Sequence, residues 1–187
     1  YTAVDDFKPE ETEGADMMGT IEFNSACFYR YANVDLGQLT KNLGGDEELA
    51  RKTLEAFIRA AVIAIPTGKQ NSMAAQNPPS FVMAVVRDDG LWSLANAFVK
   101  PVSRGRDDRE GDDLVSRSER ALATYWSQLS GMYGTDGVTG AWYTRLGADG
   151  LDELDGASVT SAGSLRELVD GVLGAASFAP NSNGRSA

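Results

Sequence analysis

The sequence predicts a fold in which helices cover a β-sheet, of either the α/β or the α+β class. Two observations support this prediction. Strand-like patterns alternate with apolar residues at helical spacing, in the order strand, helix, strand, helix, strand, helix. Hydrophobic residues make up 42% of the 187 residues, which is enough to bury the core of one large domain. No apolar run approaches the ~20 residues that a membrane-spanning helix needs.

The first expected element is a strand within residues 19–36 that ends near Asn33. Successive side chains of a strand point to opposite faces, so alternate residues share a face. The face predicted to lie against the core carries Ile21, Phe23, Cys27, Tyr29 and Tyr31. Cys27 is the only cysteine, so no internal disulfide can form, and it is expected to be a small buried side chain.

A short helical turn at residues 36–43 and a long helix at residues 47–65 are expected next. Asp46 is the predicted cap of the long helix, because its carboxylate can accept the free N–H groups of the first turn. Pro66 ends this helix. Its apolar stripe, at helical spacing, consists of Ala50, Leu54, Phe57, Ile58, Ala61 and Ile65.

The middle of the chain is predicted to hold two loops around one buried strand. Residues 67–79 have no apolar period and are rich in amide and small side chains, which is typical of a loop. Residues 80–87 form an apolar run that is typical of a buried strand. Residues 91–99 fit a strand or a helix, and residues 103–113 are expected to be a solvated loop.

The last third of the chain is predicted to add two helices and a strand. The first of these helices spans residues 114–132, and Ser116 and Glu119 have the spacing of a capping box at its start. One face of it is expected to carry Ser118, Leu122, Tyr125, Leu129 and Met132. A strand at residues 141–146 and an acidic loop at residues 147–160 follow. Ser164 and Glu167 repeat the capping spacing and open the last helix, which ends near Leu173.

Charge and residue types exclude several functions. The chain contains no histidine, which excludes Ser-His-Asp and Cys-His catalysis and most zinc sites. The formal net charge of -10 argues against nucleic-acid binding through bulk positive charge, but residues 41–87 are roughly balanced and leave room for a local basic site. The acidic runs at residues 107–113 and 149–155 lack the spacing of a calcium loop, so no metal site is predicted.

Two short segments carry candidate binding residues. Gly68-Lys69-Gln70 lacks the upstream glycine and the following Ser or Thr of a P-loop. The same loop holds one cation, amides and hydroxyls, which fit either a phosphodiester contact or an ordinary polar connection. The cluster Phe28-Tyr29-Arg30-Tyr31 loosely resembles an RNA-recognition strand. Tyr29 and Tyr31 are expected to fill the core, and Arg30 is open to either role.

Several separate motifs, in order, resemble those of a known family. The segments GTIEFNSACFYRYANVDLGQLTKNLGG, IPTGKQNSMAAQNP and SLANAFVKPV resemble the CasC (Cse-type) backbone subunit of the type I-E CRISPR Cascade complex. YTAVDDF and MGT, ahead of the first strand, fit this family as well. The resemblance covers residues 1–133 and is looser over the last third. The family's proteins are longer, so the chain is expected to be a C-terminal portion that begins inside a longer protein.

The resemblance implies a fold and a division into three parts. The fold is α+β, with a modified RNA-recognition-motif-like (ferredoxin-like) palm that bears a thumb extension and lacks its N-terminal part. Residues 1–18 would form a thumb arm and acidic loop, residues 19–174 the C-terminal portion of the palm, and residues 175–187 a flexible tail. The thumb residues that wedge between base steps would be Tyr1, Thr2 and Met18.

The resemblance also implies a function. The family's subunits are not enzymes, polymerise along the CRISPR RNA (crRNA) spacer to form the Cascade backbone, and support pairing of the guide with target DNA in antiviral defence. The expected partners are guide RNA, the target DNA strand, further copies of the chain and other Cascade subunits, in the cytoplasm, without a membrane or a cofactor. The residues expected to contact RNA are Lys69, Gln70, Asn71, Ser72 and Arg30.

Two other classes of function remain open on the residues alone. A nucleotide-dependent enzyme would use the loop of residues 68–72 with nearby carboxylates, and it would show Mg²⁺-dependent nucleotide turnover. An acidic protein-interaction module would bind a basic partner, and that association would be sensitive to salt in the absence of RNA.

Overall fold

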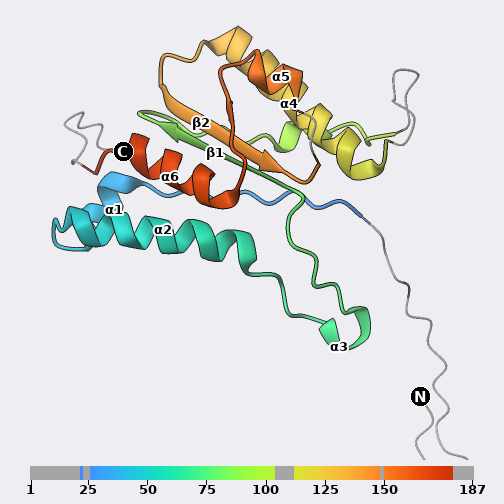
Figure 1. Ribbon diagram of the computed structural model, residues 1–187, viewed down its shortest axis with the longest axis horizontal. Helices are drawn as coiled ribbons and strands as arrows, with labels where there is room; N and C mark the ends of the chain where they lie inside the picture. The colour runs from blue at the N-terminus through green and yellow to red at the C-terminus, as the bar shows by residue number, and fades with distance from the viewer. Residues whose placement is uncertain (1–21, 23–25, 104–111, 148–149, 179–187) are drawn as a thin grey trace, which may run out of the picture.

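The structure is a computed structural model that describes residues 22, 26–103, 112–147 and 150–178. Within these ranges the fold is mixed α+β, as predicted, with a small three-stranded sheet between helices (Figure 1). None of the described helices combines the length and the apolar character that a bilayer crossing requires. The elements in chain order are α1 (Leu36–Asn42), α2 (Glu47–Ile63), α3 (Gln70–Met73), β1 (Phe81–Arg87), the 3-10 helix η1 (Ala95–Phe98), α4 (Leu114–Tyr133), β2 (Val138–Arg145), α5 (Asp152–Asp155), β3 (Thr160–Ser161) and α6 (Leu165–Ala175).

The sheet has the order β1-β2-β3. β1 and β2 are antiparallel, in a register that runs from Phe81 opposite Arg145 to Arg87 opposite Val138, with an irregularity between Val86 and Arg87. β3 adds a short parallel pairing to β2. β2 is therefore the central strand, and β1 lies at one edge of the described sheet.

Each face of the sheet packs against its own hydrophobic cluster. The first core cluster lies on the side of α4 and α5, and it includes Leu122, Trp126, Tyr143 and Leu154. The second core cluster lies on the side of α2 and α6, and it includes Leu54, Leu168, Val169 and Val172. Along β1, Phe81, Met83 and Val85 pack on the first cluster, and Val82, Ala84 and Val86 pack on the second. Alternate side chains of a strand point to opposite faces, so a sheet covered on both faces requires the continuous apolar run of β1.

The strand predicted for residues 19–33 is wrong over the part that the structure describes, because residues 26–35 belong to no strand. Cys27, expected to be buried, is exposed, and Tyr31, expected in the core, is exposed as well. Tyr29 does pack as expected, with its hydroxyl accepting the Leu94 N–H at 3.0 Å and its ring 5.7 Å from that of Phe98. A strand needs a paired neighbour, and β1 pairs only with β2 among the described residues.

The long helix predicted after Asp46 is confirmed as α2 and ends at Ile63. The Asp46 carboxylate accepts the Leu49 N–H at 2.9 Å, which satisfies one of the unpaired donors of the first turn. Residues 36–43 form α1 in the same way, with the Asp35 carboxylate accepting the Gln38 N–H at 2.8 Å. The sequence predicted the Asp46 cap but not the Asp35 cap, although in both cases the carboxylate accepts from a residue three positions along the chain.

Helix α4 is also confirmed, but its cap is Asp113 and not Ser116. The Asp113 carboxylate accepts the Ser116 N–H at 2.7 Å, so the capping box predicted for Ser116 and Glu119 is wrong. The predicted face is confirmed over Ser118, Leu122, Tyr125 and Leu129, which are buried or pack on the first core cluster, and only Met132 is exposed. The residues of α4 that are buried are Ser118, Glu119, Leu122, Ala123 and Trp126.

Several shorter segments differ from the prediction. The loop at residues 67–79 contains the one-turn helix α3, and residues 91–99 contain η1. The acidic loop at residues 147–160 contains α5 and ends in β3. The last helix begins as predicted, because the Ser164 hydroxyl accepts the Glu167 N–H at 3.2 Å and the Glu167 carboxylate accepts the Gly163 N–H at 2.9 Å. Phe178, within the predicted tail, is buried in the second core cluster, and residues 179–187 lie outside the described residues.

Candidate nucleic-acid interface

The loop that carries most of the predicted RNA contacts leaves the carboxyl end of α2 and extends away from the sheet (Figure 1). Its only regular turn is α3, which lies between two residues with left-handed backbone conformations, Lys69 (φ 56°) and Ala74 (φ 49°). Residues other than glycine adopt this conformation at a cost of about 1–2 kcal/mol. Such strained positions cluster at ligand-binding sites, and two of them enclose the turn of this loop.

The Gln70 side chain stabilises this loop through hydrogen bonds to its backbone. Its side-chain amide donates to the Pro66 carbonyl at 2.9 Å and to the Ala75 carbonyl at 3.4 Å, so it ties together the two ends of the turn. Its amide oxygen is buried and has no hydrogen-bond partner among the described residues. This geometry makes Gln70 a positioning residue for its neighbours, and a direct contact of Gln70 with RNA stays a prediction.

The other three predicted residues of the loop are exposed: Lys69, Asn71 and Ser72. The Ser72 hydroxyl donates to the Lys69 carbonyl at 3.2 Å, which holds the turn closed behind the lysine. In the described part of the chain, no carboxylate pairs with the Lys69 ammonium group. The unpaired Lys69 ammonium group beside the exposed amide of Asn71 supplies donors that suit a phosphate oxygen, whereas the single donor of the Ser72 hydroxyl is already used within the turn.

Arg30 comes from the extended segment of residues 26–35 and reaches the same end of α2. Its guanidinium donates to the Ala61 carbonyl at 2.6 Å. The last four carbonyls of a helix lack partners within the helix, and a cation there also interacts favourably with the helix dipole. Arg30 therefore caps α2 at the point where the loop with Lys69 begins, and its side chain remains exposed. Arg30 thus lies at the end of α2 from which the loop leads on to Lys69, and among the described residues no hydrogen bond joins the two side chains.

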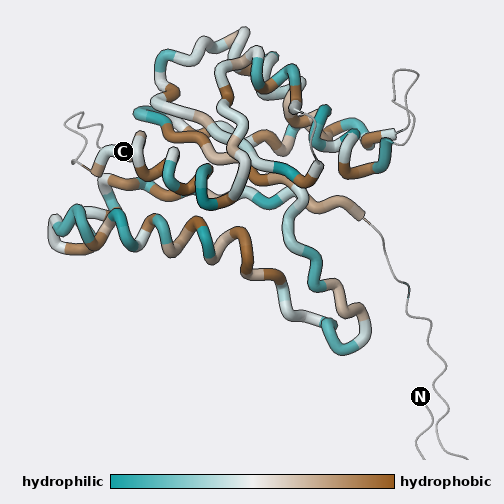
Figure 2. The backbone as a smooth tube through the Cα atoms, viewed as in Figure 1, coloured by the Kyte–Doolittle hydropathy of each residue, from teal (hydrophilic) through white to brown (hydrophobic). Residues whose placement is uncertain are grey.

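The charge of this region differs from that of the whole chain. Between Glu55 and Asp88 the sequence contains no acidic residue, whereas the formal net charge of the chain is -10. The cations in this stretch are Arg59, Lys69 and Arg87, and Arg59 pairs with Glu55 at 2.9 Å. Figure 2 shows that the last turn of α2 is hydrophobic, and Ile63 there is exposed. An acid-free stretch next to Arg30 gives the loop a locally favourable environment for an anion.

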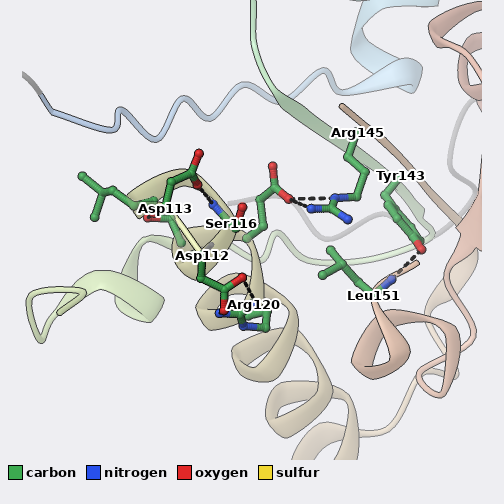
Figure 3. Close-up of polar contacts among 10 residues, drawn as sticks. Asp112, Asp113, Ser116, Arg120, Tyr143, Arg145 and Leu151 are labelled. Atoms are coloured by element: carbon green, nitrogen blue, oxygen red, sulfur yellow. Dashed lines mark hydrogen bonds and ion pairs between the residues drawn. The ribbon is translucent and has the colours of Figure 1, made fainter. Parts of the chain in front are cut away.

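A second group of polar contacts has a structural role, and the sequence did not indicate it. Figure 3 shows these contacts around the start of α4, where Asp112 pairs with Arg120 and Asp113 accepts from Ser116. The Ser116 N–H lowers the pKa of the Asp113 carboxyl below its ordinary value. The Tyr143 hydroxyl accepts the Leu151 N–H at 3.1 Å, which joins β2 to the segment before α5.

Two further features bear on a site for small ligands. A cavity of about 340 Å³ lies between the segment after η1 and the first turns of α4, and Lys100, Arg117 and Arg120 line part of it. Arg117 donates to the Asp112 carbonyl at 2.9 Å and Arg120 pairs with the Asp112 carboxylate, so both arginines are engaged in holding α4. Over the described ranges, no group of three His, Cys, Asp or Glu residues could hold a metal ion. The predicted thumb residues Tyr1, Thr2 and Met18 lie outside the described residues.

Comparisons with known proteins agree in pointing to one kind of assembly. The family model described as CT1975-like protein, a Cas family, matches residues 1–171. A solved chain from a "CRISPR RNA-guided surveillance complex" matches with 32% identity and a TM-score of 0.72, over 94% of this chain and 63% of that one. A chain from a "CRISPR RNA-guided surveillance complex, pre-nicking" matches with 33% identity and a TM-score of 0.71, over 95% of this chain and 45% of that one. This chain thus spans less than two thirds of the length of either solved chain. Comparison with curated proteins gives no match.

Proposed function

The chain belongs to the CT1975-like protein family of Cas proteins, and on this premise we propose that it is part of a non-catalytic subunit that binds CRISPR guide RNA. The assignment to a family of Cas backbone subunits made from the sequence motifs is confirmed, and the type I-E and CasC assignments stay part of the proposal. In the proposed function, copies of the full-length protein polymerise along the crRNA spacer and form the backbone of a type I-E Cascade complex. The backbone holds the guide and supports its pairing with the target DNA strand, and the sequence is read by base pairing.

One observation carries this proposal. The structural match to a chain of an RNA-guided surveillance complex covers 94% of this chain at 32% identity. A match of this extent covers nearly the whole chain, so it does not rest on one motif. The exposed Lys69 and Asn71, with Arg30 at the end of α2, supply donors that fit the phosphate backbone of a guide, and Ser72 closes the turn behind Lys69.

The finer parts of the proposal follow from the sequence motifs. The sheet and its helices would be the C-terminal portion of an RNA-recognition-motif-like palm, and residues 1–18 would supply a thumb arm. Tyr1, Thr2 and Met18 would press against base steps of the guide–target duplex. The subunit would work in the cytoplasm beside other Cascade subunits, and it would need no cofactor.

The first test is whether the protein carries RNA. Purified from cells that express a CRISPR array together with the complete gene, the protein is expected to bring down short RNA that is protected from nuclease in regular increments. Regular increments are expected because each copy covers the same length of guide. A protein that elutes free of nucleic acid, and that fails to bind guide RNA when it is added, would contradict the proposal. Mg²⁺-dependent nucleotide turnover would favour an enzyme instead.

The loop can be tested with Lys69→Ala in the full-length protein. Loss of one charged phosphate contact is expected to weaken guide-RNA binding by about 1 kcal/mol per copy, which is roughly a fivefold change. The magnitude of the slope of log affinity against log salt concentration is expected to fall by the amount that one phosphate contact contributes, about one unit. The loss of affinity should not depend on the guide sequence. Fluorescence anisotropy with labelled guide RNA at several salt concentrations measures both quantities.

Lys52→Ala is the matched control for this change. Lys52 lies on the exposed side of α2 and pairs with Glu48 at 2.6 Å, so its removal changes the net charge by the same amount away from the loop. Exposed pairs of this kind contribute less than about 1 kcal/mol to stability, so the fold is retained. Equal binding by the two variants would remove Lys69 from the interface and make its loop an ordinary connection.

A further inference from the structure

The turn around α3 is held by hydrogen bonds within its own segment. The Lys69 carbonyl accepts the Ser72 N–H at 3.1 Å and the Met73 N–H at 2.9 Å. In the described part of the chain, every hydrogen bond of residues 66–76 stays within that segment. Neither core cluster includes a residue of the range 64–79. One helical turn is not stable by itself, so this turn depends on what its own side chains contribute.

The backbone at both ends of this turn is unfavourable for the residues that occupy it. Lys69 (φ 56°, ψ 18°) and Ala74 (φ 49°, ψ 34°) are both left-handed, a conformation in which the Cβ lies too close to a carbonyl oxygen. Such a conformation persists only where surrounding contacts hold it. The Gln70 side chain supplies a contact of this kind, because its amide group joins the Pro66 carbonyl, before the turn, to the Ala75 carbonyl, after it.

The polar atoms of the Gln70 side chain are all used or buried within the turn. A side-chain amide has two N–H donors and one oxygen acceptor. The Gln70 nitrogen donates to the Pro66 carbonyl at 2.9 Å and to the Ala75 carbonyl at 3.4 Å, and the amide oxygen is buried. The neighbouring Lys69 and Asn71 are exposed instead. While the turn is closed, Gln70 therefore has no polar atom left for a phosphate or a base, whereas Lys69 and Asn71 have.

We propose that Gln70 is a positioning residue for guide-RNA binding, in place of the direct contact that the sequence predicts. Its amide keeps the turn closed, and the closed turn holds Lys69 and Asn71 on the outer side of the loop. When the turn opens, these donors lose their common orientation, so RNA binds the closed form and the measured affinity falls with the fraction of closed molecules. This inference rests on the proposed function, because it concerns the same loop.

Trypsin measures the open form in the RNA-free, full-length protein. Lys69 is the only lysine or arginine between Arg59 and Arg87, so trypsin can cut this loop only at the Lys69–Gln70 bond. Cleavage follows the population of the open form, because a closed turn does not fit an active site that binds an extended chain. Gln70→Met keeps the length of the side chain and removes both hydrogen bonds, so cleavage is expected to be about threefold faster. Each rate is divided by that of a free peptide of the same sequence, which removes any effect of the new residue on trypsin itself.

Ala74→Gly separates a positioning role from a direct contact. Glycine adopts the left-handed conformation without the cost that alanine has, so this change favours the closed turn. In the Gln70→Met protein it is expected to bring the cleavage rate back to within about twofold of the parent. Ala75→Gly is the matched control. Ala75 has no positive φ, so glycine relieves no strain there and should not slow cleavage.

Guide-RNA binding is measured on the same variants by fluorescence anisotropy. Gln70→Met is expected to weaken binding by about threefold, with an unchanged salt dependence because no charged contact is lost, and Ala74→Gly should restore most of the affinity. Cleavage of the Gln70→Met protein at the parent rate would overturn the inference, as would a loss of affinity that Ala74→Gly does not restore. A parent protein that binds no guide RNA would contradict the proposed function, and the cleavage rates would still decide whether Gln70 holds the turn.

Discussion

Replacing Arg145 by Met is expected to destabilise the protein by about 3 kcal/mol at neutral pH, the lower end of the usual cost of breaking a buried ion pair. The Arg145 guanidinium donates to the Glu119 carboxylate at 2.8 Å and links β2 to α4. The Glu119 side chain is only 5% exposed, so the variant leaves its carboxylate buried without this partner. The Arg145 side chain is 15% exposed, and its partial contact with water is the reason for expecting a cost near the lower end of that range. Urea unfolding at pH 7 measures the loss.

The cost of Arg145→Met is expected to shrink as the pH falls. Burial already raises the pKa of the Glu119 carboxyl above its ordinary value, although Arg145 acts in the opposite direction. Without Arg145 the pKa rises further, so the carboxyl becomes neutral at a higher pH. A carboxyl with a raised folded-state pKa contributes stability that is fully present below its unfolded pKa and is lost as the pH rises through the folded value. The difference in the free energy of unfolding between variant and parent should therefore become smaller as the pH falls from neutral toward the ordinary pKa of a glutamic acid.

Two further variants separate the buried pair from a general effect of charge. Arg59→Met removes the exposed ion pair between Arg59 and Glu55, whose charged atoms lie 2.9 Å apart. It is expected to lower the free energy of unfolding by less than about 1 kcal/mol. The double variant Glu119→Leu with Arg145→Met is expected to recover much of the lost stability, because apolar residues of similar size often replace a buried pair without loss. If Arg145→Met cost no more than Arg59→Met, the buried pair would have no special role in stability.

Gly171→Ala is expected to destabilise the protein by about 1–3 kcal/mol, although alanine normally favours a helix over glycine. Gly171 lies in α6 against the Trp142 ring of β2, and a Cβ at this position would stand 2.5 Å from the ring nitrogen of Trp142. A Cβ at Gly140 would stand 2.3 Å from the opposite end of the same ring, so the ring packs closely on the backbone at both glycines. The helix or the ring must shift, which disturbs the second core cluster. Thermal unfolding should show a lower midpoint.

Gly174→Ala in the same helix is the control. A Cβ at Gly174 would meet nothing within 4 Å, so only the helix preference of alanine remains. This variant is expected to be neutral or to stabilise the protein by up to about 1 kcal/mol. Opposite signs for the two glycines would show that close packing on Trp142 requires Gly171. A Gly171→Ala protein that is as stable as Gly174→Ala would contradict it.

The elements that the sequence predicted correctly depend on interactions between near neighbours. Asp46 accepts from Leu49, and Ser164 accepts from Glu167, each three residues along the chain. The strand β1 was also predicted correctly. A strand that is covered on both faces has a continuous run of apolar residues, which can be recognised without knowing the strands it pairs with. The motifs that carry the family resemblance were also legible in the sequence, and the match to residues 1–171 confirmed the family.

The candidate interface was predictable only in part. The composition of residues 68–72 indicated possible phosphate donors, but the turn into an exposed Lys69 and an internal Gln70 depends on carbonyls of Pro66 and Ala75 that folding brings together. Arg30 was left open because its partner, the Ala61 carbonyl, lies 31 residues away. Spacing within a sequence contains no information about such a distance in space.

The sequence by itself determined a fold of helices on a sheet, the three longer helices, the strand β1 and the family, because periodicity, capping and motifs are properties of a local stretch; the α+β class followed from the family resemblance. The tertiary structure decided the rest. It placed Asp113 rather than Ser116 at the start of α4, paired Glu119 with Arg145, and put Gly171 against Trp142. It also left residues 26–33 outside the sheet. The physical reason is the same in each case: an ion pair, a close contact and a strand all require a second partner, and only the folded chain determines which partner is near.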